Sequence, residues 1–170
     1  MRILVTALTI LINFILQTTL FQHLAIQGIF PNTALIIVVS YALLRGSKEG
    51  CITGICTGLL FDIFFGTTKG YYFLLFLGIS YFIGKSQKNF YRENYLLPII
   101  FCTIAAGAYE FIHFSTELIL RKDGNLLFFI LKVFLPTIVY NAIVTVPIYR
   151  VLFGINEWLE LKEKYRYRLF

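Results

Sequence analysis

Residues 50–70, GCITGICTGLLFDIFFGTTKG, contain the most regular pattern in the chain. Every fourth position is a glycine, except for one that is an aspartate: Gly50, Gly54, Gly58, Asp62, Gly66 and Gly70. At about 100° per residue, a step of four drifts by roughly 40°, so these positions form a continuous stripe along one helix. In membranes, a stripe of small residues allows a second helix backbone to approach closely. The pattern therefore predicts either packing inside the molecule or an interface with a partner.

The residues around this stripe are strongly apolar. Hydrophobic residues make up 58% of the 170-residue chain and charged residues 14%, and the mean hydropathy is +0.77. This composition excludes an ordinary soluble domain. Because a membrane span needs ~20 mostly apolar residues, we predict an all-α, polytopic integral membrane bundle of six transmembrane helices. The spans lie within one domain, 1–155, at about 3–22, 30–45, 49–67, 70–84, 95–119 and 126–154, and a basic cytoplasmic tail follows at 156–170.

The basic residues predict how the spans are oriented. If all six segments cross the membrane, most basic residues outside the spans fall on one side, which the positive-inside rule assigns to the cytoplasm together with both termini. The segments 30–45 and 70–84 are short, so interfacial or re-entrant placement of these two remains an alternative. The predicted cytoplasmic residues are Arg2, Arg45, Lys48, Lys85, Lys88, Arg92, Arg150, Lys162, Lys164, Arg166 and Arg168, against Lys69, Arg121 and Lys122 outside.

The net charge of +6 does not predict a nucleic-acid partner. The basic residues lie in short loops and a tail beside apolar segments, where helix orientation and contact with anionic lipid account for them. No basic groove or nucleic-acid-binding module is present. The bilayer is the predicted environment. The first apolar segment lacks an A-x-A-like cleavage site, so we expect it to be retained as a helix.

Residues 31–75, PNTALIIVVSYALLRGSKEGCITGICTGLLFDIFFGTTKGYYFLL, resemble the signature region of the MreD family of bacterial rod shape-determining membrane proteins. The resemblance implies a non-enzymatic scaffold subunit of the cell-elongation machinery, the elongasome, which synthesises the peptidoglycan of the side wall. It further implies association with MreC, and through MreC with MreB and the RodA/penicillin-binding-protein synthase, with no catalytic residues and no cofactor. The matching positions are Pro31, Ala42-Leu43, Arg45-Gly46, the glycine ladder Gly50-Gly54-Gly58, Leu59-Leu60, Asp62, Gly66 and Gly70.

A second polar feature interrupts the fifth span at residues 109–117, YEFIHFSTE. Glu110, His113 and Glu117 lie within roughly 60° of one another on the helix. An antiparallel hairpin at 121–125 predicts that Glu117 pairs with Lys132. Polar residues of other helices at the same depth predict a buried cluster, which is either a network that fixes helix register or a cavity for a ligand or a partner's helix. The cluster comprises Gln17, Asn32, Asp62, Glu110, His113, Glu117, Lys132 and Asn141.

No catalytic or metal-binding constellation is predicted. Glu110-x-x-His113 has the spacing used in di-metal bundles, but the second such pair that those sites require is missing. Neither G-x-S-x-G nor H-E-x-x-H occurs. Cys51, Cys56 and Cys102 lack metal-type spacing. We therefore predict a protein that is not an enzyme and holds no metal.

The alternative function is that of a substrate-binding membrane subunit of an energy-coupling-factor vitamin transporter. Such subunits have six helices and an outward-facing polar pocket, and the MreD family is similar to them in fold. In the tail, Trp158 is predicted at headgroup level beside several basic residues. The tail is either a topological anchor or a docking segment for a cytoskeletal partner.

Overall fold

The computed structural model of the chain describes residues 2–23, 25, 28–66, 70–86, 96–121 and 126–167. All regular elements within these residues are helical, as predicted. The first five predicted segments each contain a helix whose ends lie within three residues of the predicted ends. The elements are α1 (Arg2–His23), α2 (Thr33–Arg45), α3 (Ser47–Phe65), α4 (Tyr71–Lys85), α5 (Leu96–Arg121), α6 (Leu126–Phe129), the π-helix η2 (Ile130–Phe134) and α7 (Leu135–Tyr167).

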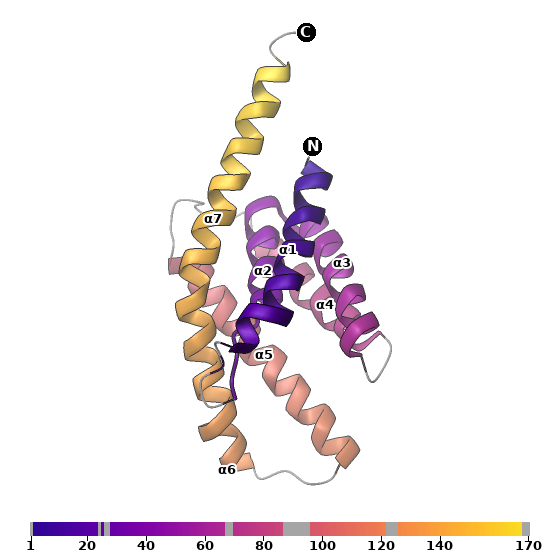
Figure 1. Cartoon of the computed structure of the whole chain (residues 1–170), viewed down its shortest axis with the longest axis vertical. Helices are drawn as coiled ribbons and strands as arrows, with labels where there is room; N and C mark the ends of the chain where they lie inside the picture. Colours follow the sequence, from indigo (N-terminus) through magenta and orange to yellow (C-terminus); the bar gives the residue numbers. More distant parts are fainter. Residues whose placement is uncertain are drawn as a thin grey trace.

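The last three elements follow one another without a break and form one long helical rod, which continues beyond the remaining helices (Figure 1). The 33 residues of α7 correspond to about 50 Å of helix, longer than a hydrocarbon core of ~30 Å. Residues 156–167, which we expected to form a tail, are the end of this helix. The helix continues because Asn156 and Leu159 are buried, and Asn156 accepts a hydrogen bond from Arg45 of α2.

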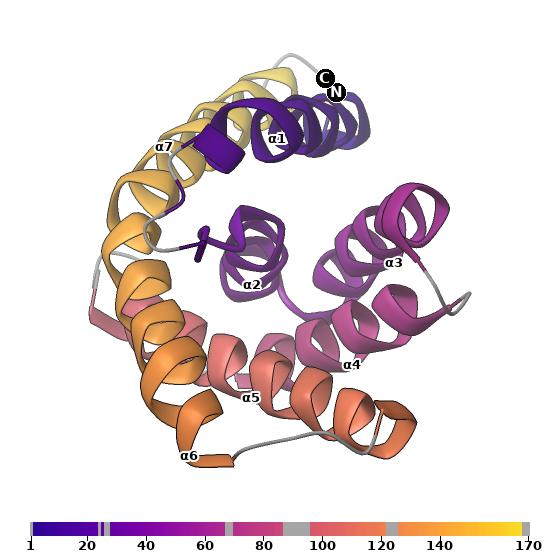
Figure 2. The same cartoon turned by 60° about the horizontal axis from the view of Figure 1, so that its bottom comes forward.

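Helix α2 lies at the centre of the bundle, surrounded by α1, α3, α4, α5 and α7 (Figure 2). All residues from Thr33 to Leu44 are buried. The sequence TALIIVVSYALL has apolar residues on every side, and a helix of this kind is stable only when it is enclosed. At 13 residues, α2 is about 20 Å long, too short for an ordinary span, but its neighbours separate it from the surroundings.

The glycine stripe packs α3 against its neighbours within the molecule. A Cβ atom added at Gly54 would lie 2.8 Å from the carbonyl oxygen of Phe76 in α4, and one at Gly58 would lie 2.5 Å from the Cα of Phe73. At Gly50, an added Cβ would lie 2.7 Å from the Cα of Ala42 in α2. These approaches are closer than side chains allow, so glycine is required at all three positions. The stripe therefore joins α3 to α4 and to α2.

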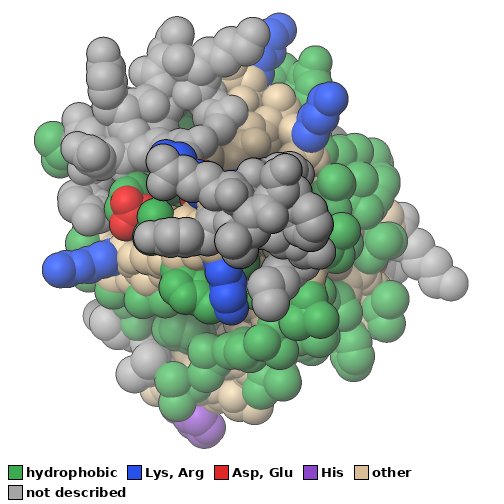
Figure 3. Space-filling model, turned by 90° about the horizontal axis from the view of Figure 1, so that it is seen from above, with side chains coloured by type: hydrophobic (Ala, Val, Ile, Leu, Met, Phe, Trp, Pro, Cys, Tyr) green, Lys and Arg blue, Asp and Glu red, His purple; other side chains and the backbone are tan. Residues whose placement is uncertain are grey.

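The outside of the bundle is apolar. Within the described residues, three helical segments are long and apolar enough to cross a membrane: Arg2–Phe21, Leu96–Thr116 and Leu127–Lys164. Two shorter apolar helices, Thr33–Arg45 and Tyr71–Lys85, accompany them. Large hydrophobic side chains such as Ile104 and Ile143 are more than 60% exposed. Figure 3 views the end at which the N-terminus lies: basic side chains stand at this end, and hydrophobic side chains surround them.

Candidate functional site

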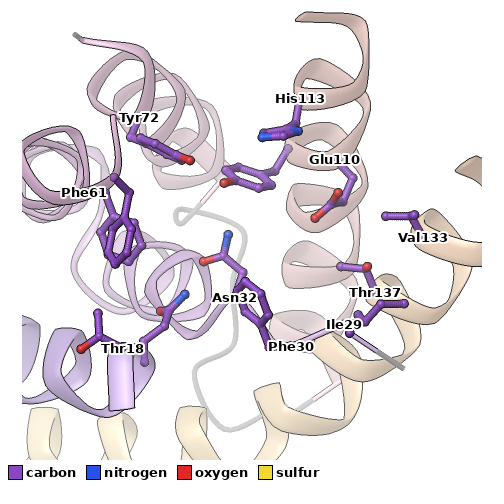
Figure 4. A pocket seen from close by; sticks show the side chains of 14 residues that line it. Thr18, Ile29, Phe30, Asn32, Phe61, Tyr72, Glu110, His113, Val133 and Thr137 are labelled. Atoms are coloured by element: carbon purple, nitrogen blue, oxygen red, sulfur yellow. The ribbon is translucent and has the colours of Figure 1, made fainter. Parts of the chain in front are cut away.

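A cavity of about 310 Å³ lies among α1, α3, α4, α5 and the start of the last rod. Figure 4 shows that its walls come from segments far apart in the sequence. One side is lined by amides and hydroxyls, and the other by tyrosines, a histidine and a carboxylate. The polar lining residues are Gln17, Thr18, Asn32, Tyr72, Tyr109, Glu110, His113 and Thr137, and the remaining ones are Gly28, Ile29, Phe30, Phe61, Phe65 and Val133.

The structure brings four members of the predicted polar cluster into this lining: Gln17, Asn32, Glu110 and His113. A fifth, Asn141, lies next to it, because its Oδ1 accepts a hydrogen bond from the backbone N–H of Asn32 at 2.8 Å. These five residues come from α1, α5, α7 and the segment before α2. Residues from widely separated parts of the chain thus meet around one cavity.

The amide side of the cavity holds the beginning of α2. Gln17 Oε1 accepts hydrogen bonds from the hydroxyl of Thr33 and the backbone N–H of Ala34, both at 2.8 Å. Asn32 Oδ1 accepts from the backbone N–H of Leu35 at 3.0 Å. The first N–H groups of a helix have no partner within the helix, and inside an apolar bundle they need one. Gln17 and Asn32 therefore allow α2 to begin within the protein.

The opposite side combines aromatic rings with a carboxylate. The rings of Tyr109 and His113 stack at a centroid distance of 6.2 Å, and the ring of Phe76 stacks on Tyr109 at 6.1 Å. The side chain of Glu110 is half-buried and points into the cavity (Figure 4). Within the described part of the chain, Glu110 makes neither an ion pair nor a hydrogen bond. A carboxylate beside tyrosine rings attracts cationic groups, so this side could hold an ammonium or a guanidinium.

Asp62, also predicted in the cluster, has a different position. Its two carboxylate oxygens accept hydrogen bonds from the backbone N–H groups of Tyr72 and Phe73, each at 3.0 Å. A carboxylate at a helix N-terminus satisfies unpaired donors and interacts favourably with the helix dipole. The preceding Gly70 has φ +89°, in the left-handed region that favours glycine. Asp62 therefore caps α4 and belongs to the α3–α4 hairpin.

Of the other two predicted members, Lys132 is not among the residues that line the cavity. The side chain of Lys132 is exposed on η2. The side chain of Glu117 lies outside the described residues, so the ion pair between Glu117 and Lys132 stays a prediction. Among the residues that the structure describes, no three His, Cys, Asp or Glu side chains are grouped to hold a metal ion.

Two tyrosines of the cavity, Tyr72 and Tyr109, were missed by the sequence analysis. Tyr109 lies four residues before His113, and this spacing brings two side chains together on a helix. The sequence therefore contained a signal that Tyr109 lies beside the predicted cluster. Tyr72 lies on α4, and the sequence contains no signal that places it opposite α5.

A second site missed from sequence is the network around Arg45. Its side chain is only 4% exposed. It donates to Asn156 Oδ1 at 2.8 Å, to Thr6 Oγ1 at 2.9 Å and to Glu49 Oε2 at 3.2 Å, and it lies 4.6 Å from the ring centroid of Tyr41. Arg45 thus connects α1, α2, α3 and α7. The sequence indicated only a charge at the end of an apolar segment.

Comparisons with known proteins give consistent results. The family model described as rod shape-determining protein MreD matches residues 1–156. The curated rod shape-determining protein MreD of Bacillus subtilis (strain 168) is 26% identical over 131 residues, covering 75% of this chain and 76% of that protein. No solved structure matches the chain.

Proposed function

The chain belongs to the family of rod shape-determining protein MreD, and from this premise we propose that it is a non-enzymatic membrane scaffold of the bacterial cell-elongation machinery. Its task is to help to maintain rod shape while peptidoglycan is inserted along the side wall. The observation that carries the proposal is the family match over residues 1–156. No enzymatic step is part of this proposal.

In the proposed arrangement, all six helical rods cross the cytoplasmic membrane and both termini are cytoplasmic. The three long apolar helices support a membrane location, and the distribution of basic residues supports the orientation. The short α2 and α4 are compatible with spanning because a bundle can thin the bilayer locally or shield a short helix from lipid. The basic end in Figure 3 then faces the cytoplasm.

The proposed partner is MreC, with MreB and the RodA/penicillin-binding-protein synthase in the same assembly. Because Gly54 and Gly58 pack against α4, we place the partner on other surfaces than the glycine face. The opposite side of α3 is a candidate, since it exposes Ile52, Leu59 and Ile63. Large apolar side chains on the outside of a membrane bundle can contact either lipid or another helix.

Affinity purification tests this proposal. The full chain, tagged at one end, is purified from its native membrane in a mild detergent, and the proteins that accompany it are identified by mass spectrometry. A tagged polytopic membrane protein of the same abundance serves as the control. We expect MreC together with RodA or its penicillin-binding partner. Recovery of ATPase subunits and a coupling membrane protein instead would overturn the scaffold proposal.

The cavity supports a second candidate function, substrate capture for an energy-coupling-factor transporter. Its volume of about 310 Å³ is within the range of small-molecule sites. Asn32, Glu110 and Tyr109 supply the few polar groups that such a site needs to orient a ligand. Saturable binding of a vitamin-like molecule to the purified protein, abolished by Glu110→Gln, would favour this function over the scaffold.

A further inference from the structure

The carboxylate of Glu110 brings a negative charge into the cavity, and nothing in the described part of the chain neutralises it. Among the described lining residues there is neither a lysine nor an arginine. Lys132, which precedes the lining residue Val133, is exposed and is not part of the lining. A carboxylate within a membrane bundle is costly unless it meets a cation, a hydrogen-bond donor or water. The cavity therefore offers an acceptor to a molecule that enters it.

Aromatic rings enclose the space in front of this carboxylate. Figure 4 shows the hydroxyl of Tyr72 and the carboxylate of Glu110 pointing into the cavity from opposite walls. Phe30, Phe61 and Tyr109 add further rings to the lining. The faces of such rings attract cations, and the carboxylate adds the attraction of a full charge. Together they favour an organic cation over a neutral or anionic molecule.

The same lining does not favour a metal ion. No three His, Cys, Asp or Glu side chains are grouped for one among the described residues, and hard divalent ions prefer several oxygen ligands. A single carboxylate is balanced by a single positive charge. Primary ammonium and guanidinium groups carry that charge and donate hydrogen bonds to carboxylate oxygens. The volume of about 310 Å³, at ~30 Å³ for each water-sized group, accommodates about ten non-hydrogen atoms.

Contacts within the protein hold the walls of the cavity in place. The backbone N–H of Tyr72 donates to Asp62 at 3.0 Å, which fixes the first turn of α4 beside the cavity. The ring of Tyr109 lies between Phe76, at a centroid distance of 6.1 Å, and His113, at 6.2 Å. A site whose walls are held in this way loses little conformational freedom when a ligand binds. The rings and the carboxylate are thus arranged before a ligand enters.

We propose that the cavity binds a small organic monocation. Its primary ammonium or guanidinium group donates hydrogen bonds to the carboxylate of Glu110, and its apolar body lies against the rings of Tyr72 and Tyr109. This inference deepens the second candidate function, because it names the class of molecule that the cavity takes, and it does not depend on the scaffold role. An ammonium group can come from a free amine or from the headgroup of phosphatidylethanolamine, and the experiment distinguishes these two sources.

Three probes of similar size test the sign of the charge: phenethylammonium, the neutral 2-phenylethanol and the anion phenylacetate. Their binding to the purified full-length protein, in a neutral detergent at neutral pH, is followed by ligand-observed NMR. We expect saturable binding of phenethylammonium. Binding of 2-phenylethanol should be weaker by roughly tenfold or more, since the alcohol lacks the charge-assisted hydrogen bond, and phenylacetate should not bind. The proposal is overturned if the alcohol or the anion binds as tightly as the ammonium.

Glu110→Gln tests whether the carboxylate is the counter-ion. The amide retains the shape of the side chain and removes its charge, so binding of phenethylammonium should weaken by roughly tenfold while binding of 2-phenylethanol stays unchanged. Glu157→Gln makes the same change at an exposed position of α7 outside the cavity and should bind both probes as the wild type does. Unchanged binding of phenethylammonium to Glu110→Gln, or an equal loss for both probes, would contradict the proposed role of Glu110.

Nanodiscs identify the source of the ammonium group. Phenethylammonium is titrated into the protein in nanodiscs of phosphatidylglycerol alone and in nanodiscs that contain an equal amount of phosphatidylethanolamine with identical acyl chains. Weaker binding of the probe in the second set assigns the group to the lipid, and equal binding assigns it to a free amine; both results support an ammonium site. If no ammonium binds while affinity purification recovers MreC, this inference fails and the scaffold proposal stands.

Discussion

The α3–α4 hairpin and the cavity side of the bundle solve the problem of burial in different ways. In the hairpin, glycines bring two backbones into contact, and Asp62 satisfies the first donors of α4 locally. On the cavity side, Gln17 and Asn141 reach across from other helices, and a space of about 310 Å³ remains. One side is held by close contact and the other by hydrogen bonds over long sequence separations. The hairpin is therefore built for close packing, whereas the cavity side has room for a ligand.

The largest effect should follow from a side chain placed in the close-packed hairpin. A Cβ at Gly58 would lie 2.5 Å from the Cα of Phe73, which cannot move without displacing α4. Overpacking of this kind typically costs about 1–3 kcal/mol or more, and a leucine has three further carbons to accommodate. We expect Gly58→Leu to abolish folded protein, measured as the monodisperse fraction in size-exclusion chromatography of solubilised membranes.

Gly78→Leu is the matched control for this experiment, because an added Cβ at Gly78 of α4 meets no atom within 4 Å. Leucine also has a better helix propensity than glycine by about 0.8 kcal/mol. Wild-type or higher yield is therefore expected from Gly78→Leu. If Gly58→Leu folds as well as Gly78→Leu, close backbone contact does not hold the hairpin.

The next effect concerns the hydrogen bonds of the cavity side. Gln17→Leu retains the approximate volume but leaves the N–H of Ala34 and the hydroxyl of Thr33 without their acceptor. Each unsatisfied buried group costs about 1–3 kcal/mol, so we expect a marked fall in the thermal stability of the purified protein. Thr18→Val, at the neighbouring lining position, is the comparison. If the Gln17→Leu variant is as stable as the wild type, α2 does not depend on this cap.

A smaller loss is expected from the cap of the hairpin. Asp62→Ala removes both acceptors of the N–H groups of Tyr72 and Phe73, and the loss of a helix cap costs about 0.5–2 kcal/mol. Asp62→Asn keeps an acceptor and should lie between the alanine variant and the wild type. Thermal unfolding in one detergent ranks the three proteins. If both variants are as stable as the wild type, the carboxylate oxygens of Asp62 contribute nothing as a cap.

The same two regions show how far sequence reasoning reaches. The stripe could be found because its period lies within one helix, and its helical face follows from the spacing of Gly50, Gly54 and Gly58 alone. Its partner helices could not be found, since the pattern has the same appearance whether α4 or another protein covers it. Asp62 was grouped with the cluster by depth, although local capping decides its contacts. The meeting of Gln17 with Thr33 depends on the tilt of α1, which no local pattern encodes.

Arg45 also shows that contacts between helices cannot be predicted from a local pattern. Basic residues at the ends of apolar segments usually orient helices, and the sequence analysis assigned Arg45 that role alone. A network with Thr6 and Asn156 requires that α1 and α7 meet at the end of α2, which is a property of the assembled bundle. Local chemistry therefore predicted the helices, whereas the contacts between them required the structure.

The smallest effect on stability, and the sharpest test of the comparison, is expected from Glu110→Gln. The carboxylate points into the cavity and has no ion pair or hydrogen bond within the described residues, so its neutral isostere breaks no contact there. We expect a change in unfolding free energy within about 0.5 kcal/mol, whereas Gln17→Leu in the same cavity is clearly destabilised. If cells that express the Glu110→Gln variant in place of the wild type keep their normal rod shape, the cavity only fixes helix register. Loss of rod shape at normal protein levels would indicate that Glu110 binds a cationic group. The α3–α4 hairpin cannot bind one in this way, because the carboxylate of Asp62 already accepts hydrogen bonds from α4. A destabilisation as large as that of Gln17→Leu would contradict the distinction between the two regions.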